Sequence, residues 1–256
     1  MAPLYLSEEQ SAEFARAGML RLPDYFPQAL AAGLADKLWN DLRKRFGIDR
    51  DRPETWSVER PAQYQDLIKA GAFNALGDGF QSIADAFLGE GAWERPRNLG
   101  QPLVTFQSRS WDVPHNMWHL DVPAQADGGG LQFVFVFVLL GRIEPRGGGT
   151  CYVEASHRFI MQSVRDSNGS LRSADVKPLL EREPWFAALF SKSLSENRTR
   201  RLLDGETVRG VEVRVAEITG NAGDVFVMHP ATLHTAAPNA CATPRMMLVQ
   251  PLARGR

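Results

Sequence analysis

Cysteine is scarce in this sequence, whose 256 residues include only Cys151 and Cys241. Two thiols cannot build the disulfide framework of a small secreted domain or a thiolate zinc cluster, and free thiols suit a reducing compartment. The N-terminal residues also lack the basic start and the apolar stretch of a secretory signal. We therefore expect a cytoplasmic protein.

An excess of charge of one sign is also missing. The 29 Lys and Arg residues nearly balance the 30 Asp and Glu residues, so the formal net charge is -1. This balance predicts no nucleic-acid partner and no polybasic attachment to a membrane surface. The longest apolar run, Phe133–Leu140, is far shorter than the roughly 20 residues that span a bilayer. With 44% hydrophobic residues, the chain instead has the composition of a globular protein.

Residues 1–95 have the pattern of helices. Ser7 and Gln10 form a capping-box pattern, in which each side chain satisfies a free backbone N–H at the start of a helix, and Gly18 is a suitable stop. Leucines recur every four residues between 28 and 46, and Gly47 follows. A third helix is expected over 72–88. Together these segments predict a helical layer.

After Pro96 the pattern changes to short β-type runs separated by Gly, Pro and Asp, which is typical of an antiparallel barrel or sandwich. The run at 131–140 lies between the glycine runs at 128–130 and 147–149, which favours a buried central strand over a helix. The other expected strands are 103–106, 150–154, 211–215, 225–228 and 245–250. The predicted fold is one continuous domain over 1–256, mainly β, with the helical layer at 1–95 and the β core at 96–256.

The pair His119 and Asp121 is the first candidate for chemistry. Residues i and i+2 of a strand point to the same face, so an imidazole and a carboxylate at this spacing can reach one metal ion. Taken alone the pair is a weak signal, because a histidine hydrogen-bonded to a nearby aspartate at a strand end has the same pattern.

A histidine on a later strand would complete a set of two histidines and one carboxylate, the facial triad of non-haem Fe(II) enzymes. Both His229 and His234 are candidates, and Pro230 after His229 indicates a strand end. Arg245 starts the next apolar run, where its guanidinium can bind a carboxylate such as that of 2-oxoglutarate through two hydrogen bonds. Gln107 can donate to the same cosubstrate or be an ordinary polar strand residue.

These motifs, in this order, resemble the phytanoyl-CoA dioxygenase family of Fe(II)/2-oxoglutarate-dependent oxygenases. The matching pieces are 118–121 (WHLD), 147–150 (GGGT) leading to Ser156 and His157, 223–230, His234, Asn239 and Arg245, with an opening helix and strand at 6–26. The chain departs from the usual pattern at Ala155, where the family commonly has glycine, and at Thr235, where glycine commonly follows the distal histidine.

The resemblance implies a double-stranded β-helix (jelly-roll, cupin-like) core. It implies iron held by His119, Asp121 and His234, with 2-oxoglutarate bound by Arg245. It further implies oxidation of a small organic molecule or acyl derivative with O₂, releasing succinate and CO₂. Related halogenases lack the carboxylate ligand, so Asp121 favours hydroxylation. Two alternatives remain: a cupin-like metalloenzyme that does not use 2-oxoglutarate, and a catalytically inactive binding protein.

The segment 158–210 lies between the two halves of the expected metal site. It is mostly polar, with one expected aromatic helix at 184–190. We expect a mobile cover over the site; the alternative is a helix packed permanently on the core. Its arginines Arg198, Arg200 and Arg201 can bind a phosphate or carboxylate, or form a solvated face.

Overall fold

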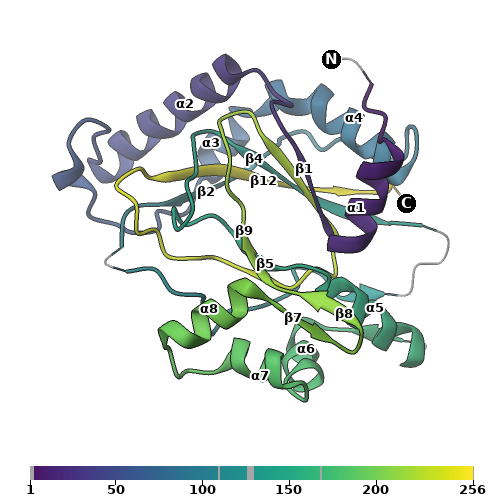
Figure 1. The fold of residues 1–256 in the computed structure, drawn as a ribbon. Coiled ribbons are helices and arrows are strands. Elements are labelled where there is room, and N and C mark those ends of the chain that lie inside the picture. The colour runs from purple at the N-terminus through teal and green to yellow at the C-terminus, as the bar shows by residue number, and fades with distance from the viewer. Residues whose placement is uncertain (1–2, 109, 126–129, 168, 256) are drawn as a thin grey trace.

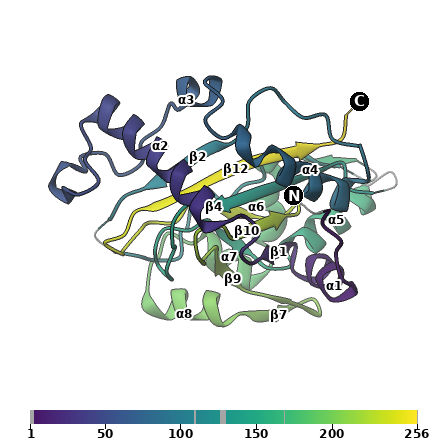
Figure 2. The same cartoon turned by 90° about the horizontal axis from the view of Figure 1, so that it is seen from above.

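The computed structural model describes residues 3–108, 110–125, 130–167 and 169–255. Figure 1 shows helices above a large sheet, a smaller sheet below it, and further helices beneath the smaller sheet, and Figure 2 looks down on the upper helices where they lie over the large sheet. The α-helices are α1 (Glu8–Ala17), α2 (Gln28–Phe46), α3 (Gln65–Lys69), α4 (Gly77–Leu88), α5 (Ser156–Ser167), α6 (Ser173–Leu180), α7 (Pro184–Phe190) and α8 (Glu196–Asp204). Short 3₁₀ turns cover Pro53–Thr55 and Asn74–Leu76.

The large sheet is antiparallel and has the strand order β1-β10-β4-β12-β2. Its strands are β1 (Met19–Leu22), β2 (Gln101–Thr105), β4 (Phe133–Leu139), β10 (Val225–Met228) and β12 (Arg245–Ala253). The run at 131–140 is thus a central strand, as predicted. Of the glycine run before it, residues 128 and 129 lie outside the described residues.

The smaller sheet has the order β11-β5-β9, with β5 (Cys151–Val153), β9 (Val215–Glu217) and β11 (His234–Thr235). The remaining strands of the described residues form two short antiparallel pairs, β3 (Ala124–Gln125) with β6 (Ser170–Leu171) and β7 (Glu206–Val208) with β8 (Val211–Val213). The predicted antiparallel β core is confirmed.

Alternation along the strands explains the layers. In β4 the valines at 134, 136 and 138 pack in one core cluster with α2 and α4, whereas Phe135, Phe137 and Leu139 face the smaller sheet and contact a second cluster that includes Tyr152. Since successive side chains of a strand point to opposite faces, one apolar run serves both cores. The metal-ligand candidates lie on the side of the large sheet that faces β5 and β11.

The N-terminal helices follow their local signals. The Ser7 hydroxyl accepts from the Gln10 N–H, the Gln10 side chain accepts from the Ser7 N–H, and Gly18 ends α1 in the left-handed conformation. The helix over 28–46 has the predicted bounds and ends at Gly47. The helix expected over 72–88 is shorter, because a 3₁₀ turn precedes α4. Residues 1–95 also supply β1, so this part of the chain is not solely a helical layer.

The single strand predicted over 211–215 is wrong. The alternation of valines continues through it, but the backbone changes partners at Arg214: β8 pairs with β7 and β9 pairs with β5. A β-hairpin turn at Arg209 and Gly210, both with positive φ, precedes β8. Periodicity alone does not reveal such a change of partner, since each side keeps the same in-and-out pattern.

The segment 158–210 contains most of α5 and the whole of α6, α7 and α8, rather than one helix in a polar loop. Trp185 and Phe186 are fully buried in a third core cluster, which also contains residues of β5 and β9. Burying two such side chains contributes roughly 1.5–3 kcal/mol each. Of the two expectations for the aromatic helix, the structure shows the packed arrangement.

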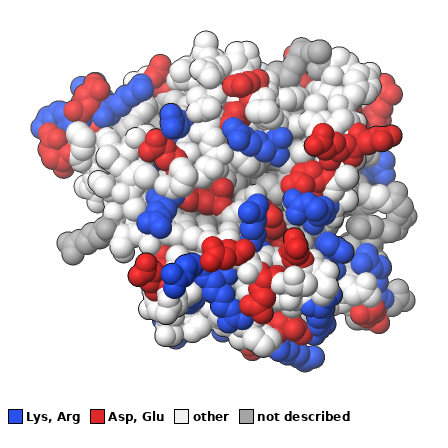
Figure 3. Space-filling view, in the orientation of Figure 1, with Lys and Arg blue, Asp and Glu red and all other residues white. Residues whose placement is uncertain are grey.

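Opposite charges are interspersed on the face shown in Figure 3, with no large field of one sign. No helix in the described ranges combines the length and the apolar character needed to cross a membrane.

Candidate metal centre

His119, Asp121 and His234 converge at one point between the sheets. Each offers one ligand atom, and these atoms lie within 4.8 Å of one another. The Asp121 carboxylate stands between the two rings, with Oδ1 at 3.4 Å from His119 Nε2 and Oδ2 at 3.2 Å from His234 Nε2. The predicted triad is therefore assembled in space, with the Nε2 atoms of both histidines directed at the same carboxylate.

Backbone carbonyls hold both imidazole rings in this orientation. His119 Nδ1 lies 2.6 Å from the Met117 carbonyl oxygen, and His234 Nδ1 lies 3.0 Å from that of Thr232. A carbonyl can only accept, so each Nδ1 carries a proton and donates it, which leaves Nε2 as the ring atom that can coordinate a metal ion. Met117 achieves its contact with a left-handed φ of 60°, an uncommon conformation for a residue other than glycine.

The electrostatics favour a carboxylate ligand that is already ionised. Burial raises the pKa of Asp121, but hydrogen bonds and charge interactions with both histidines outweigh it, and the pKa lies well below its usual range. The hydrogen bond with Asp121 raises the pKa of His119 in return. A divalent cation would replace the protons that this cluster otherwise shares.

His119 and His234 meet through a single β-bridge, in which each backbone N–H donates to the other's carbonyl. The regular strand predicted around His119 is absent from the described residues: Asp121 follows in a bend. His119 and His234 can still reach one metal ion, because the bridge aligns His119 with β11.

Arg245 opens β12 and is buried, with 4% of its surface exposed. Its Nε has no hydrogen-bond partner within the described part of the chain. Directly opposite on β2 lies Thr105, which is fully buried and whose hydroxyl is likewise without a partner among those residues. Paired residues of neighbouring strands point to the same face, so a guanidinium and a hydroxyl lie side by side with free donors.

No carboxylate among the described residues forms an ion pair with the Arg245 guanidinium, although Glu217 lies near enough to interact with it electrostatically. Burial, together with the nearby positive charge of Arg60, lowers the pKa of Arg245 to about 10. Its acidic neighbour Glu217 is engaged elsewhere, accepting from the backbone N–H groups of Arg146 and Gly149, and burial raises the pKa of Glu217 to about 7. Buried cations ordinarily have a bound partner, so this arrangement fits an external anion.

Arg245 also interacts electrostatically with the thiol of Cys151, which pairs across the smaller sheet with Thr235, next to His234. Met247, two residues further along β12, packs in the cluster that contains Tyr152 of β5, so Arg245 points to the side of the large sheet on which the smaller sheet and His234 lie. The residues of this chain fit both a metal ion, through two imidazoles and a carboxylate, and a carboxylate-bearing cosubstrate beside it.

Gln107 is exposed, and its amide donates to the Ala240 carbonyl at 3.4 Å. Its predicted contact with a cosubstrate would require this bond to be released, and it stays a prediction. A cavity of about 480 Å³ opens beside His119, and its polar lining includes Glu59, Arg60 and Asp112.

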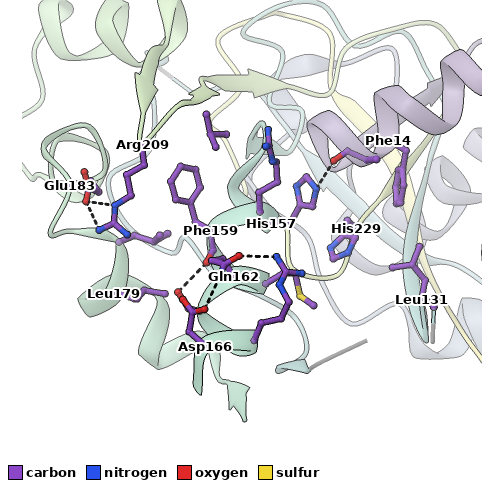
Figure 4. A pocket seen from close by; sticks show the side chains of 18 residues that line it. Phe14, Leu131, His157, Phe159, Gln162, Asp166, Leu179, Glu183, Arg209 and His229 are labelled. Carbon is purple, nitrogen blue, oxygen red and sulfur yellow. Dashed lines mark hydrogen bonds and ion pairs between the residues drawn. The ribbon is translucent and has the colours of Figure 1, made fainter. Parts of the chain in front are cut away.

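His229 lies elsewhere. Its ring is 4.9 Å from that of His157, and both line a cavity of about 700 Å³ with Phe14, Phe159 and Leu131 (Figure 4). Burial lowers the pKa of His229 to about 3 and that of His157 to about 4, so both rings are neutral. The alternative in which His229 replaces His234 as a ligand is therefore not the arrangement that the structure assembles.

His157 is the structural histidine predicted: Nε2 contacts the Ala15 carbonyl at 3.1 Å. Ala155, at the position where glycine was expected, has a left-handed φ of 62°. The departure from the usual motif therefore changes the residue and keeps the turn. Thr105 was missed from the sequence, and only its register opposite Arg245 identifies it.

Comparison with known proteins gives structural but not sequence relatives. No family model matches the chain, and no curated protein matches it in sequence, so the resemblance to the phytanoyl-CoA dioxygenase family is not confirmed at that level. HygX from Streptomyces hygroscopicus, solved with nickel and 2-oxoglutarate, is 16% identical with a TM-score of 0.53, over 98% of this chain and 88% of its own.

The carbocyclase SnoK of nogalamycin biosynthesis, described as non-haem and alpha-ketoglutarate-dependent, is 17% identical with a TM-score of 0.55, over 99% of this chain and 87% of its own. AviO1 from Streptomyces viridochromogenes Tue57 is 16% identical with a TM-score of 0.54, over 98% and 96%. At these identities the similarity establishes the fold alone. This chain has the fold that 2-oxoglutarate-dependent non-haem enzymes use.

Proposed function

We propose that this protein is an Fe(II)/2-oxoglutarate-dependent oxygenase that oxidises, most simply by hydroxylation, a small organic molecule. The observation that carries the proposal is the combination of a preoriented His-Asp-His triad with a buried arginine that has no dedicated counter-ion among the described residues. A jelly-roll core accords with the two facing antiparallel sheets and with the shared fold.

In this proposal the Nε2 atoms of His119 and His234 and one Asp121 oxygen hold the iron. Three protein ligands on one face leave other coordination positions for a cosubstrate and O₂. When bound, the iron and 2-oxoglutarate supply the oxidising chemistry, with succinate and CO₂ as products. The protein contributes the coordination geometry, which the carbonyls of Met117 and Thr232 maintain by fixing both rings.

Arg245 and Thr105 would bind the distal carboxylate of 2-oxoglutarate. The guanidinium supplies charge and two parallel donors, and the hydroxyl supplies a third donor. Their burial excludes water, so these hydrogen bonds are stronger than they would be at the surface. Gln107 is retained as a proposed additional contact after a side-chain rearrangement.

The mouth beside His119 favours a small substrate with both polar and apolar parts, because its cavity of about 480 Å³ is lined by charged side chains such as Arg60 and by apolar ones such as Leu194. Solved proteins of this fold include an epimerase and a carbocyclase, so the fold does not determine the reaction. Hydroxylation is proposed because Asp121 retains the carboxylate ligand.

The decisive experiment measures succinate formed from 2-oxoglutarate with Fe(II), ascorbate and O₂, with and without panels of small organic substrates. We expect slow succinate formation without substrate and faster formation with an accepted one, and none of either in Arg245→Met. Oxidation of a substrate without 2-oxoglutarate would instead support the cupin-like alternative. Tight ligand binding with no turnover under any condition would support an inactive binding protein.

A further inference from the structure

Arg198 of α8 is a buried arginine. Only 7% of its surface is exposed, and its guanidinium donates to four backbone carbonyls. Nε donates to Ala188 at 2.8 Å and Nη2 to Leu189 at 2.7 Å, both in α7; Nη1 donates to Val113 at 2.7 Å, and Nη2 also to Pro114 at 3.1 Å. One side chain therefore joins α7 and α8 to the segment that precedes the metal ligands.

This burial lowers the pKa of Arg198, which reflects the cost of removing its charge from water, and its four acceptors are carbonyls rather than carboxylates. A planar guanidinium with donors in fixed directions places its acceptors precisely. The adjacent Thr199 hydroxyl donates to the Asp112 carboxylate, a second contact between α8 and the same segment.

From Pro114 the connection continues to the ligand His119. The Pro114 carbonyl also accepts from the indole N–H of Trp118 at 2.8 Å, which closes the chain between them into a tight loop. Within that loop lies Met117, whose left-handed backbone directs its carbonyl at His119 Nδ1. On the far side of His119, the Ser173 hydroxyl of α6 accepts from the Leu120 N–H at 3.1 Å.

Helix α8 thus contacts the ligand segment before His119, and helix α6 contacts it after His119. We propose that Arg198 is a positioning residue for the metal centre: by fixing the carbonyls of Val113 and Pro114, it sets the loop that orients the His119 ring. The inference rests on the proposed metal site and gives the segment 158–210 the role of a buttress. Arg198 serves this role from the protein interior, where it is not available to bind a phosphate at the surface.

The test is the binding of Co(II) to the purified full chain without 2-oxoglutarate, followed by its visible absorption spectrum. Arg198→Lys keeps the positive charge and removes the planar set of guanidinium N–H donors. We expect a several-fold larger dissociation constant and an altered spectrum. The loss should be smaller than the tenfold or more usual for a direct contact to a metal ligand, because Arg198 acts through the loop that carries Met117. Arg200→Lys is the matched control, because Arg200 is exposed on the same helix and donates to Asn197.

Leu202→Ala separates positioning from general destabilisation. Leu202 is fully buried on α8, so the change costs roughly 2–5 kcal/mol of stability while leaving the Arg198 contacts in place. It should lower the thermal midpoint and retain the wild-type Co(II) spectrum. If Arg198→Lys does not fold, Ser173→Ala tests the same buttress by deleting the contact to Leu120 alone, with a several-fold loss of Co(II) affinity expected.

A folded Arg198→Lys protein with wild-type Co(II) affinity and spectrum overturns the inference, and so does wild-type binding in Ser173→Ala when Arg198→Lys cannot be made. His234→Ala distinguishes this failure from failure of the proposed function. If Co(II) binds the wild type and His234→Ala equally, the metal site itself is wrong and the inference falls with it.

Discussion

Thr105→Val is predicted to move stability and cosubstrate affinity in opposite directions. The Thr105 hydroxyl is fully buried, lacks a partner in the described structure and lies opposite Arg245. Valine keeps the β-branched shape that suits strand β2, so the substitution removes one polar group with little change in packing.

The magnitudes follow from the cost of an unsatisfied polar group. A buried donor without a partner costs about 1–3 kcal/mol, so its removal should raise the free energy of unfolding of the cosubstrate-free protein by about 1 kcal/mol. For a chain of this size that corresponds to about 2–4 °C in the thermal midpoint. A hydrogen bond to a charged group contributes about 1.5–3 kcal/mol, so the affinity for 2-oxoglutarate should fall about tenfold or more.

The assay compares thermal unfolding and calorimetric titration of 2-oxoglutarate in the Ni(II)-loaded protein, in which turnover does not interfere. Ser156→Ala is the control for sign: its buried hydroxyl donates to the Val153 carbonyl and accepts from the Leu233 N–H, so its removal should lower stability. A lower thermal midpoint in Thr105→Val would show that its hydroxyl already has a partner. Unchanged affinity for 2-oxoglutarate would refute its place in the carboxylate site.

Four further predictions follow from the same structure. His234→Ala should abolish tight Co(II) binding while His229→Ala should retain it, as measured by titration; the reverse result would exchange their roles. Arg245→Lys should raise the KM for 2-oxoglutarate about tenfold or more with nearly unchanged metal affinity, because it keeps the charge and loses the paired donors; an unaltered KM would contradict the assignment. Burial lowers the pKa of His157 from 6.5 to about 4, so the unfolded chain binds a proton that the folded chain does not, and stability present above pH 6.5 is lost as the pH falls toward 4. As the pH falls through this range, the free energy of unfolding of His157→Gln, measured with denaturant, should rise relative to that of the wild type by up to about 3 kcal/mol. A difference that does not change with pH would contradict the lowered pKa of His157. Hydrogen exchange of the α7 amides should be slow with and without ligands, since Trp185 and Phe186 are buried. Fast exchange that slows on ligand binding would instead support the interpretation of 158–210 as a mobile cover.

Local sequence patterns predicted several elements of the fold. The capping box at Ser7, the leucine spacing over 28–46 and the apolar run at 131–140 each specify an element through interactions within a few residues of the chain, and the structure has all three. The five-stranded order could not be read in this way, since it depends on which strands meet across long connections. The change of partner at Arg214 is an example.

For the candidate site, the sequence by itself determined which residue types are present and their spacing: an imidazole and a carboxylate two residues apart, a later histidine and an arginine at a strand start. That was enough to propose the ligand set. The resemblance favoured His234 over His229 as the third ligand, and the tertiary structure brings His234 rather than His229 to His119 and Asp121, because the two histidines join different sheets.

The tertiary structure also decided how the site is supported. Thr105 belongs with Arg245 because β2 pairs with β12 in that register, and Arg198 reaches the ligand segment from a helix more than eighty residues away. Neither Thr105 nor Arg198 could be identified from the local sequence, since a threonine or arginine at the surface occurs in the same sequence patterns. Burial makes the hydrogen bonds of both side chains important, because in the interior every donor needs an acceptor, and the fold sets the position of that acceptor.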